Sequence, residues 1–353
     1  MNAPGFTVNL FISTPRTPVR FVCVIRVPVC PVCVPAPPGV FCPVLTVPRY
    51  NGAHERVCGL MQTSGVGEVD DRATIVHLGA RHLGRVSRST IHRLACDVLL
   101  LLHGIRDAIL YDYTADKAAG APRAFLESLA ECFEAARDLV LLVIGESFFF
   151  IMRGALAKAM SRTLRGDDGG TELVAVDSGL PAPRPCTAAE RLAVHAVFFS
   201  MASEIRAQLN EHEQLSHAQT PRQLAAASPL VLKLQAPTPP AAMVAIHGWL
   251  LGYPSIFCYA REAPTAGTSC LGGVPLAVVQ LIASYPARLC KAGAAPTSHL
   301  VCSFSVPATE ENVAEKPILQ DWRDDVRRRF AAQTYWQLER MSVETRLHEH
   351  VVL

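Results

Sequence analysis

From residue 89 onward, apolar positions recur at the spacing of amphipathic helices. The first such helix is predicted to begin at Ser89, whose side chain can cap it, and to end at Gly104, which suits the position just past a helix. Pro122 is predicted to open the next helix, and residues 153–164 to form a shorter one. A further helix is expected near 241–251.

Two more helices are predicted, one long and one at the end of the chain. Thr187 and Glu190 have the spacing of a capping box, so the long helix is expected to begin there. Its predicted apolar face consists of Leu192, His195, Phe198, Phe199, Ala202, Ile205 and Leu209. The closing helix is predicted to bury Ile318, Leu319, Trp322, Val326 and Phe330. Its arginines alternate with aspartates, which indicates a solvated outer face.

Short apolar runs between the helices predict strands. The first three runs lie at 108–113, 139–146 and 172–177. Because each is apolar on both faces and alternates with helices, they are typical of a parallel sheet covered by helices. Three later runs lie at 255–260, 271–283 and 299–306, and their short connections favour antiparallel pairing. The predicted fold is α/β, with a mixed sheet whose first part is parallel with crossover helices and whose last part is antiparallel.

Composition divides the chain into three parts. Residues 1–85 are rich in proline and cysteine, and proline at this density prevents a central strand or a helix. We expect this part to be disordered or loosely extended, or to be a wrongly assigned start of the gene. Residues 86–340 are predicted to form a single α/β domain, and 341–353 a tail. The proline-containing stretch 215–240 is predicted to be a linker within the domain.

The stretch HGWLLGYPSIFCYA, residues 247–260, predicts a helix end, a corner and a strand. Gly252 suits the left-handed conformation just past a helix. Pro254 keeps Tyr253 out of helical geometry. This corner is explained by backbone conformation without a ligand.

Composition and charge restrict the classes of partner and the compartment. Half of the 353 residues are hydrophobic, 18% are charged and the formal net charge is +2. This balance indicates neither a nucleic-acid nor a membrane-surface partner. No clean run of about twenty apolar residues predicts a membrane helix. Most of the twelve cysteines lie in apolar runs, among them Cys96, Cys132, Cys258 and Cys302, which favours reduced, buried thiols and a cytoplasmic location.

Three acidic residues have equivalent places in the predicted parallel strands. Asp112, Glu146 and Asp177 each end or nearly end one of them. In open α/β sheets, ligands bind outside the carboxyl ends of the strands. If the carboxylates converge there, they are candidate catalytic residues or ligands of Mg²⁺ or Mn²⁺. The alternative is that they cap the loops and helices that follow.

Two weaker motifs suggest other chemistry. IGESFF, residues 144–149, resembles the start of a nucleophile elbow, although Phe149 replaces the second glycine. Ser147, Asp177 and His247 follow one another in the chain order of such a hydrolase triad. Cys30 and Cys33 have the C-x-x-C spacing of zinc ligands, but no well-spaced second pair accompanies them.

Several segments together resemble a known family. The segments AILYDY, VIGES, VAVDS, LLGYPSIFCYA, SCLGGVPLAVVQLIAS and CSFSVP occur in this order, before WRDDVRRRF. They resemble an uncharacterised family, named in human as chromosome 1 open reading frame 74, that consists of a domain of unknown function. The resemblance covers about 89–335. It implies a single α/β domain and no established activity, substrate or cofactor.

Two functions are consistent with these patterns. The first is a non-enzymatic interaction module that works through a protein partner. The second is a metal-assisted enzyme that acts on phosphorylated or nucleotide-like substrates through Asp112, Glu146 and Asp177. The fold does not decide between them, because functional sites are added to folds. Convergence of the three carboxylates would favour the enzyme, and a large exposed apolar patch would favour the module.

Overall fold

The structure is a computed structural model. It describes residues 6–14, 17–25, 71–84, 86–113, 120–167, 170–217, 229–237, 242–259, 269–285, 297–308 and 313–348. Most of the proline- and cysteine-rich N-terminal part therefore lies outside the described residues. Within residues 1–85, the structure describes β1 (Phe6–Thr14) and β2 (Thr17–Ile25), which pair antiparallel, and the whole of α1 (Asp71–His82) with the residues just after it. The prediction of no helix in this part was therefore wrong for α1, whose twelve residues contain no proline.

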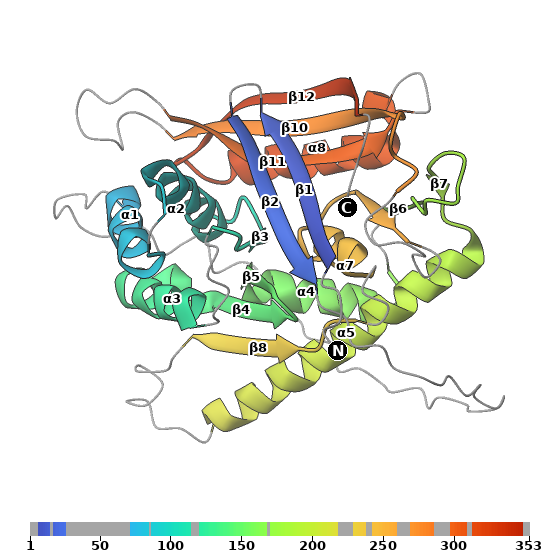
Figure 1. Ribbon diagram of the computed structural model, residues 1–353. Helices are drawn as coiled ribbons and strands as arrows, with labels where there is room; N and C mark the ends of the chain where they lie inside the picture. Colours follow the sequence, from blue (N-terminus) through green and yellow to red (C-terminus); the bar gives the residue numbers. More distant parts are fainter. Residues whose placement is uncertain are drawn as a thin grey trace, which may run out of the picture.

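The main sheet has four strands in the order β3-β5-β4-β8 (Figure 1). Their bounds are β3 (Ala108–Leu110), β4 (Leu139–Ile144), β5 (Ser147–Met152) and β8 (Leu230–Leu234). The strand β5 runs antiparallel to both β3 and β4, whereas β8 runs parallel to β4. Every residue of β4 is buried, as expected for a strand covered on both faces.

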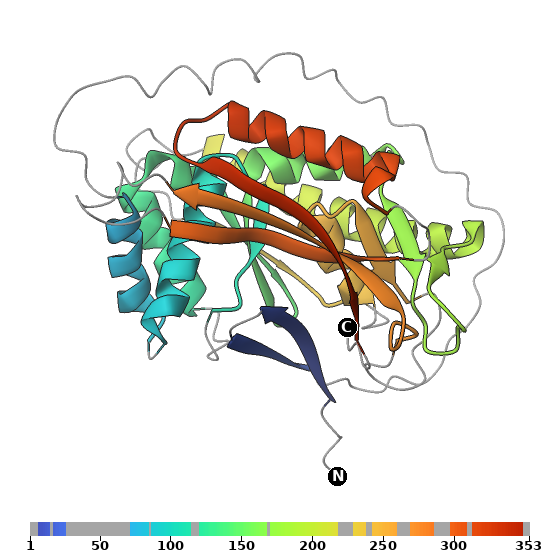
Figure 2. The same ribbon diagram turned by 90° about the horizontal axis from the view of Figure 1, so that it is seen from above.

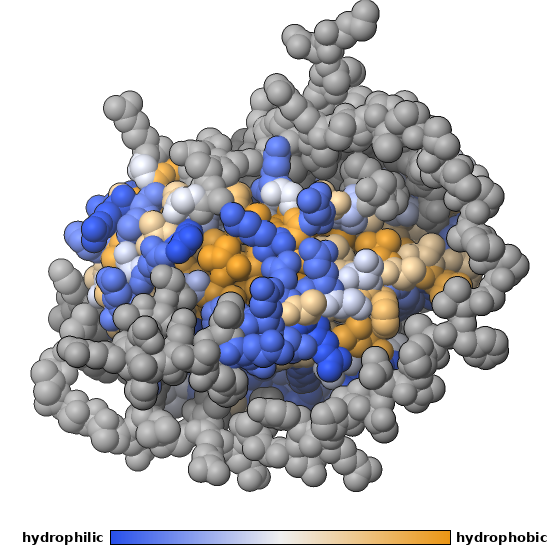
Figure 3. Space-filling model, turned by 90° about the horizontal axis from the view of Figure 1, so that it is seen from below, coloured by the Kyte–Doolittle hydropathy of each residue, from blue (hydrophilic) through white to orange (hydrophobic). Residues whose placement is uncertain are grey.

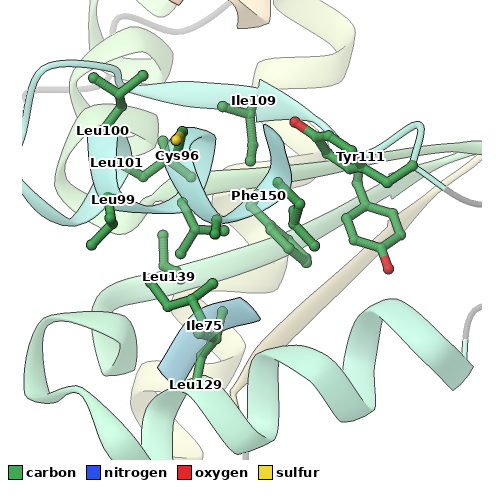
Figure 4. Packing of buried hydrophobic residues seen from close by; sticks show 14 of the residues in the cluster. Ile75, Cys96, Leu99, Leu100, Leu101, Ile109, Tyr111, Leu129, Leu139 and Phe150 are labelled. Atoms are coloured by element: carbon green, nitrogen blue, oxygen red, sulfur yellow. The ribbon is translucent and has the colours of Figure 1, made fainter. Parts of the chain in front are cut away.

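Helices cover the two faces of this sheet and create two apolar clusters. On one face lie α1, α2 (Arg88–Leu102) and α3 (Gly120–Cys132). Figure 4 shows their packing, in which Ile75, Leu99 and Leu129 from the helices meet Leu139 and Phe150 from the sheet. On the other face lie α4 (Arg153–Leu164), α5 (Ala188–His217) and α7 (Ala242–Leu250).

Two smaller sheets complete the domain. The order β7-β6-β9 joins β6 (Glu172–Ala175), β7 (Arg184–Pro185) and β9 (Ser255–Cys258), with β6 and β9 parallel. The order β11-β10-β12 joins β10 (Pro275–Tyr285), β11 (Thr297–Pro307) and β12 (Gln337–Leu347), all antiparallel. The helix α8 (Pro317–Ala331) lies along this last sheet (Figure 2). Short 3₁₀ turns occupy Glu134–Asp138 and Val313–Glu315.

The predicted class, a mixed α/β fold with an antiparallel last part, is confirmed, but the parallel pairs join other strands than predicted. The predicted strand 139–146 consists of β4 followed by a tight turn, which leads directly into β5. Gly145 has a positive φ of 57°, as two-residue hairpin turns require. The strand β5 therefore separates β3 from β4, while β6 lies in another sheet. The first of the three later strands, β9, also pairs parallel with β6 rather than antiparallel with β10.

Two helix starts can be compared with the capping residues predicted from the sequence. The capping box is confirmed, because the Thr187 amide donates to Glu190 Oε2 at 2.7 Å and the Glu190 amide to Thr187 Oγ1 at 3.3 Å. The prediction for α2 was wrong by two residues, since Ser87 rather than Ser89 accepts the hydrogen bond from the Thr90 amide.

Among the described elements, six strands, one whole helix and the end of another helix were not predicted. The strands are β1, β2, β5, β7, β8 and β12, and the whole helix is α1. The stretch taken as the linker 215–240 contains the end of α5 and the whole of β8, and 218–228 and 238–241 lie outside the described residues. The strand β12 extends into the predicted tail 341–353 and pairs along β10.

The corner after α7 has the predicted backbone. Gly252 has a φ of 71°, its amide donates to Trp249 O, and the Tyr253 amide donates to Gly248 O at 3.0 Å. These two bonds are those of a Schellman motif, which satisfies carbonyl groups at the end of α7. The chain then enters β9 directly after Pro254.

We expect Gly252→Ala to lower the free energy of unfolding by about 1–2 kcal/mol, because a Cβ is strained in the left-handed conformation. A Cβ at Gly252 would have nothing within 4 Å, so strain is the only steric penalty. Gly154 in α4 is equally open but has no positive φ, and Gly154→Ala is expected to be neutral or stabilising. Urea denaturation of both variants checks this, and equal losses would contradict it.

Candidate functional site

The three predicted carboxylates do not form one group. Asp112 follows β3, and Glu146 lies in the turn after β4. The carboxyl ends of β3, β4 and β8 meet at this end of the main sheet, since β3 and β4 both run antiparallel to β5. Asp177 instead follows β6 in a different sheet, where it is buried and bridges Ser269. The structure therefore brings Asp112 and Glu146 to one sheet end and leaves Asp177 apart.

Metal ligation finds no support in the described part of the chain. There, no group of three or more His, Cys, Asp or Glu side chains is arranged to hold a metal ion. The predicted zinc ligands Cys30 and Cys33 lie outside the described residues.

Asp177 lies among thiols and a tyrosine. Burial and the charge of Asp177 together raise the pKa of Tyr259 to about 12. Cys186 and Cys258 lie nearby and share a hydrogen bond, which lowers the pKa of Cys186 and raises that of Cys258. Asp177 follows a strand of a different sheet from Ser147, and it forms no described contact with His247. The three residues therefore do not form the predicted triad.

Two members of that predicted triad do meet. Ser147 Oγ and His247 Nε2 are 3.1 Å apart, at hydrogen-bond distance. Ser147 is the first residue of β5, and His247 projects from α7 toward the same end of the main sheet. Both residues are half-buried. Burial lowers the pKa of His247 to about 4, so its imidazole is neutral at physiological pH.

A buried charged network lies on the other side of this sheet end. Its centre is Asp97, in the middle of α2 and 6% exposed. Asp97 Oδ1 lies 3.0 Å from His299 Nε2 and 3.6 Å from Arg106 Nη1, and Oδ2 accepts a hydrogen bond from the Tyr113 hydroxyl. Arg106 also donates to Val301 O at 2.9 Å. The network thus joins α2 and the loops around β3 to β11.

The network keeps Asp97 ionised. Burial by itself would raise the pKa of this carboxyl, but His299, Arg106 and Tyr113 together hold it below its ordinary value. The sequence contains a signal for this residue that the predictions did not use. Asp97 lies inside the apolar run LACDVLLLL, and a charge at a buried position requires a partner.

Tyr253 of the corner lies within reach of the same charges. Burial raises its pKa to about 12, and Arg106 and Asp97 act on it electrostatically. Its ring stacks on Phe304 with centroids 5.3 Å apart. The corner after α7 therefore also places a phenol beside the network, a role beyond turning the chain.

Asp112 is the exposed carboxyl beside this network. The protein around it desolvates the group and raises its pKa to about 6, with Arg93 opposing the rise and Asp97 adding to it.

A second candidate site lies on the outer face of α5. Val194, Phe198 and Ile205 of this helix are buried, in the apolar cluster of the main sheet. The predicted apolar face was wrong for two residues, because Leu192 and Phe199 are 72% and 51% exposed. In Figure 3, which views the molecule from the side where α5 lies in Figure 1, apolar surface interrupts the hydrophilic surface.

These features define a mixed α/β domain with a charged network between two sheets. The chain belongs to the family described as a domain of unknown function (DUF4504), whose model matches residues 77–353. The matched range begins within α1 and includes β12. No curated protein and no solved structure matches the chain. None of the described helices combines the length and hydrophobicity that a membrane span requires.

Replacing Asp97 with alanine is expected to lower the free energy of unfolding by about 3–5 kcal/mol, because it leaves a buried Arg106 charge unpaired. Because the pKa of Asp97 is lowered in the folded state, its contribution is present at neutral pH and is lost on acidification. The control is Asp324→Ala, which removes an exposed ion pair to Arg327 and should change stability by less than about 1 kcal/mol. Similar values for the two variants in urea denaturation would refute this assignment.

The raised pKa of Asp112 predicts a pH-dependent loss of stability. The folded state favours the protonated carboxyl, so the parent should lose stability relative to Asp112→Asn as pH rises from about 4 to about 6. Above that window the difference should be constant. Urea denaturation of both proteins across the window measures it. A difference that does not vary with pH would show that the carboxyl titrates normally.

Proposed function

We propose that this protein is a protein-interaction domain that binds an amphipathic helix of a partner along the outer face of α5. The observation that carries this proposal is the exposure of Leu192 and Phe199 on a helix whose other side is packed in the core. With Leu347, they are the only large hydrophobic side chains highly exposed in the described part of the chain.

The spacing of these residues creates a continuous apolar stripe. Leu192 and Phe199 are seven residues apart, two turns of helix, so they lie on one side. Ala196 is exposed between them, and Ser203 continues the stripe by one more turn. The small side chains of Ala196, between the leucine and the phenylalanine, and of Ser203, one turn beyond the phenylalanine, allow a second helix to approach closely.

The size of the stripe favours a transient complex. From Leu192 to Ser203 it is about 16 Å long, given the rise of a helix per residue. A single helix docked over this length covers less area than a stable standard interface. The exposed aromatic ring of Phe199 is the expected anchor of the complex, because aromatic residues supply much of the binding energy at interfaces.

The alternative, a metal-assisted enzyme for phosphorylated or nucleotide-like substrates, has less support. It requires Asp112, Glu146 and Asp177 to act together, whereas Asp177 follows a strand of a different sheet. A more specific kinship, to the family named in human as chromosome 1 open reading frame 74, rests on the sequence resemblance. A cytoplasmic location is part of the proposal, since the described cysteines are free thiols and half of them are buried.

The test is photo-cross-linking in cells from an unnatural aromatic residue at position 199. We expect an adduct with a distinct partner protein, and Leu192→Glu should abolish it because a charge interrupts the stripe. This exposed substitution should change stability by less than about 0.5 kcal/mol, so loss of the adduct would not reflect unfolding.

The matched control is Glu204→Gln, on the same helix but to the side of the stripe and exposed. This variant should keep the adduct. Adducts that persist in Leu192→Glu, or adducts only between copies of this chain, would contradict the proposed function.

A further inference from the structure

We propose that Ser147 is a nucleophile activated by His247, and that the pair hydrolyses small uncharged carboxylic esters. This activity is independent of the interaction surface on α5. It rests on the 3.1 Å separation of Ser147 Oγ and His247 Nε2, and on the elements that hold these atoms in place.

Both side chains are positioned by rigid structure. Ser147 begins β5 directly after the turn at Gly145, where its backbone pairs with Ile144 of β4. The Phe149 ring stands edge-on to the His247 imidazole with centroids 5.3 Å apart. The next residue on α7, Gly248, packs tightly on β9, because a Cβ there would lie 3.1 Å from the Ile256 side chain. The close packing of α7 on β9 therefore fixes the position of the imidazole.

The chemistry follows from a neutral imidazole beside a hydroxyl group. Ser147 Oγ attacks the ester carbonyl carbon while its proton moves to His247 Nε2. The tetrahedral intermediate collapses, and the alcohol leaves with that proton. Water then attacks the acyl-serine by the same route, which releases the carboxylic acid and restores Ser147. Each step conserves charge, and water is the only co-reactant.

The surroundings indicate the class of substrate. Ile144 and Phe149 belong to the apolar cluster on the side of the sheet that faces α7. An uncharged acyl group suits such neighbours better than a charged one, since a charge near them would lose its hydration. Asp112 lies beside the start of β5, because the Tyr111 amide donates to Phe148 O at 2.7 Å. Its negative charge further disfavours anionic substrates.

A fluorophosphonate probe tests the nucleophile in the full chain. In this reaction the Ser147 Oγ–phosphorus bond forms, fluoride leaves and His247 accepts the proton. Mass spectrometry should locate the label on Ser147. Ser147→Ala should not be labelled at this position, and labelling of Ser147 in His247→Gln should be about 100-fold slower, the usual contribution of a general base. The control Ser161→Ala, which removes an exposed hydroxyl of α4, should be labelled at the parent rate.

The pH dependence of labelling provides a second readout that needs no folded variant at position 247. The rate should rise with a midpoint near the His247 pKa of about 4 and then remain level through neutral pH. No label on Ser147, an equal rate in folded His247→Gln, or a rate that keeps rising with hydroxide would overturn the proposal. Turnover of p-nitrophenyl acetate should exceed that of Ser147→Ala, and equal turnover would overturn the substrate class.

Discussion

The buried carboxylate of Asp97 is the constraint on which the arrangement of this domain depends. It lies in the buried, apolar second half of α2, where an unpaired charge would be strongly destabilising. Its partners come from other segments: Arg106 and Tyr113 flank β3, and His299 lies on β11. Because the buried carboxylate requires these three partners, it specifies how α2, the end of β3 and the antiparallel sheet pack together. Apolar packing alone tolerates more than one such arrangement.

Other polar contacts reinforce this junction. The Trp336 indole donates to His103 Nδ1 at 3.1 Å, which ties the end of α2 to the beginning of β12. Arg329 of α8 forms an ion pair with Asp107, just before β3. On the other side of the main sheet, α5 and α7 meet where Phe198 stacks on Trp249, with ring centroids 5.0 Å apart. This contact lies between the exposed stripe of α5 and the helix that carries His247, so the two proposed functions share one packed layer.

Helix caps and corners, which depend on neighbouring residues, were predicted from the sequence. Strand partners and long-range contacts, which depend on distant segments, were not. The capping box at Thr187 and the glycine at 252 depend on a few neighbouring residues, and both are confirmed. The strand β8 was missed because its five residues lie among prolines, and β12 because most of its side chains are polar and partly exposed. The separation of Asp177 from Asp112 and Glu146 was not predictable from spacing, because it depends on which sheet each strand joins. The contact between Ser147 and His247 spans 100 positions, so the sequence supplied their order but not their distance.

A double-mutant cycle between Asp97→Asn and His299→Gln tests the central claim most directly. The free energy of unfolding of the parent, both single variants and the double variant would be measured by urea denaturation. If the carboxylate and the imidazole join α2 to β11, the two changes should be non-additive, with a coupling of about 1–3 kcal/mol. Additivity to within about 0.5 kcal/mol would show that the two side chains stabilise the fold independently, and would contradict a network that sets the junction.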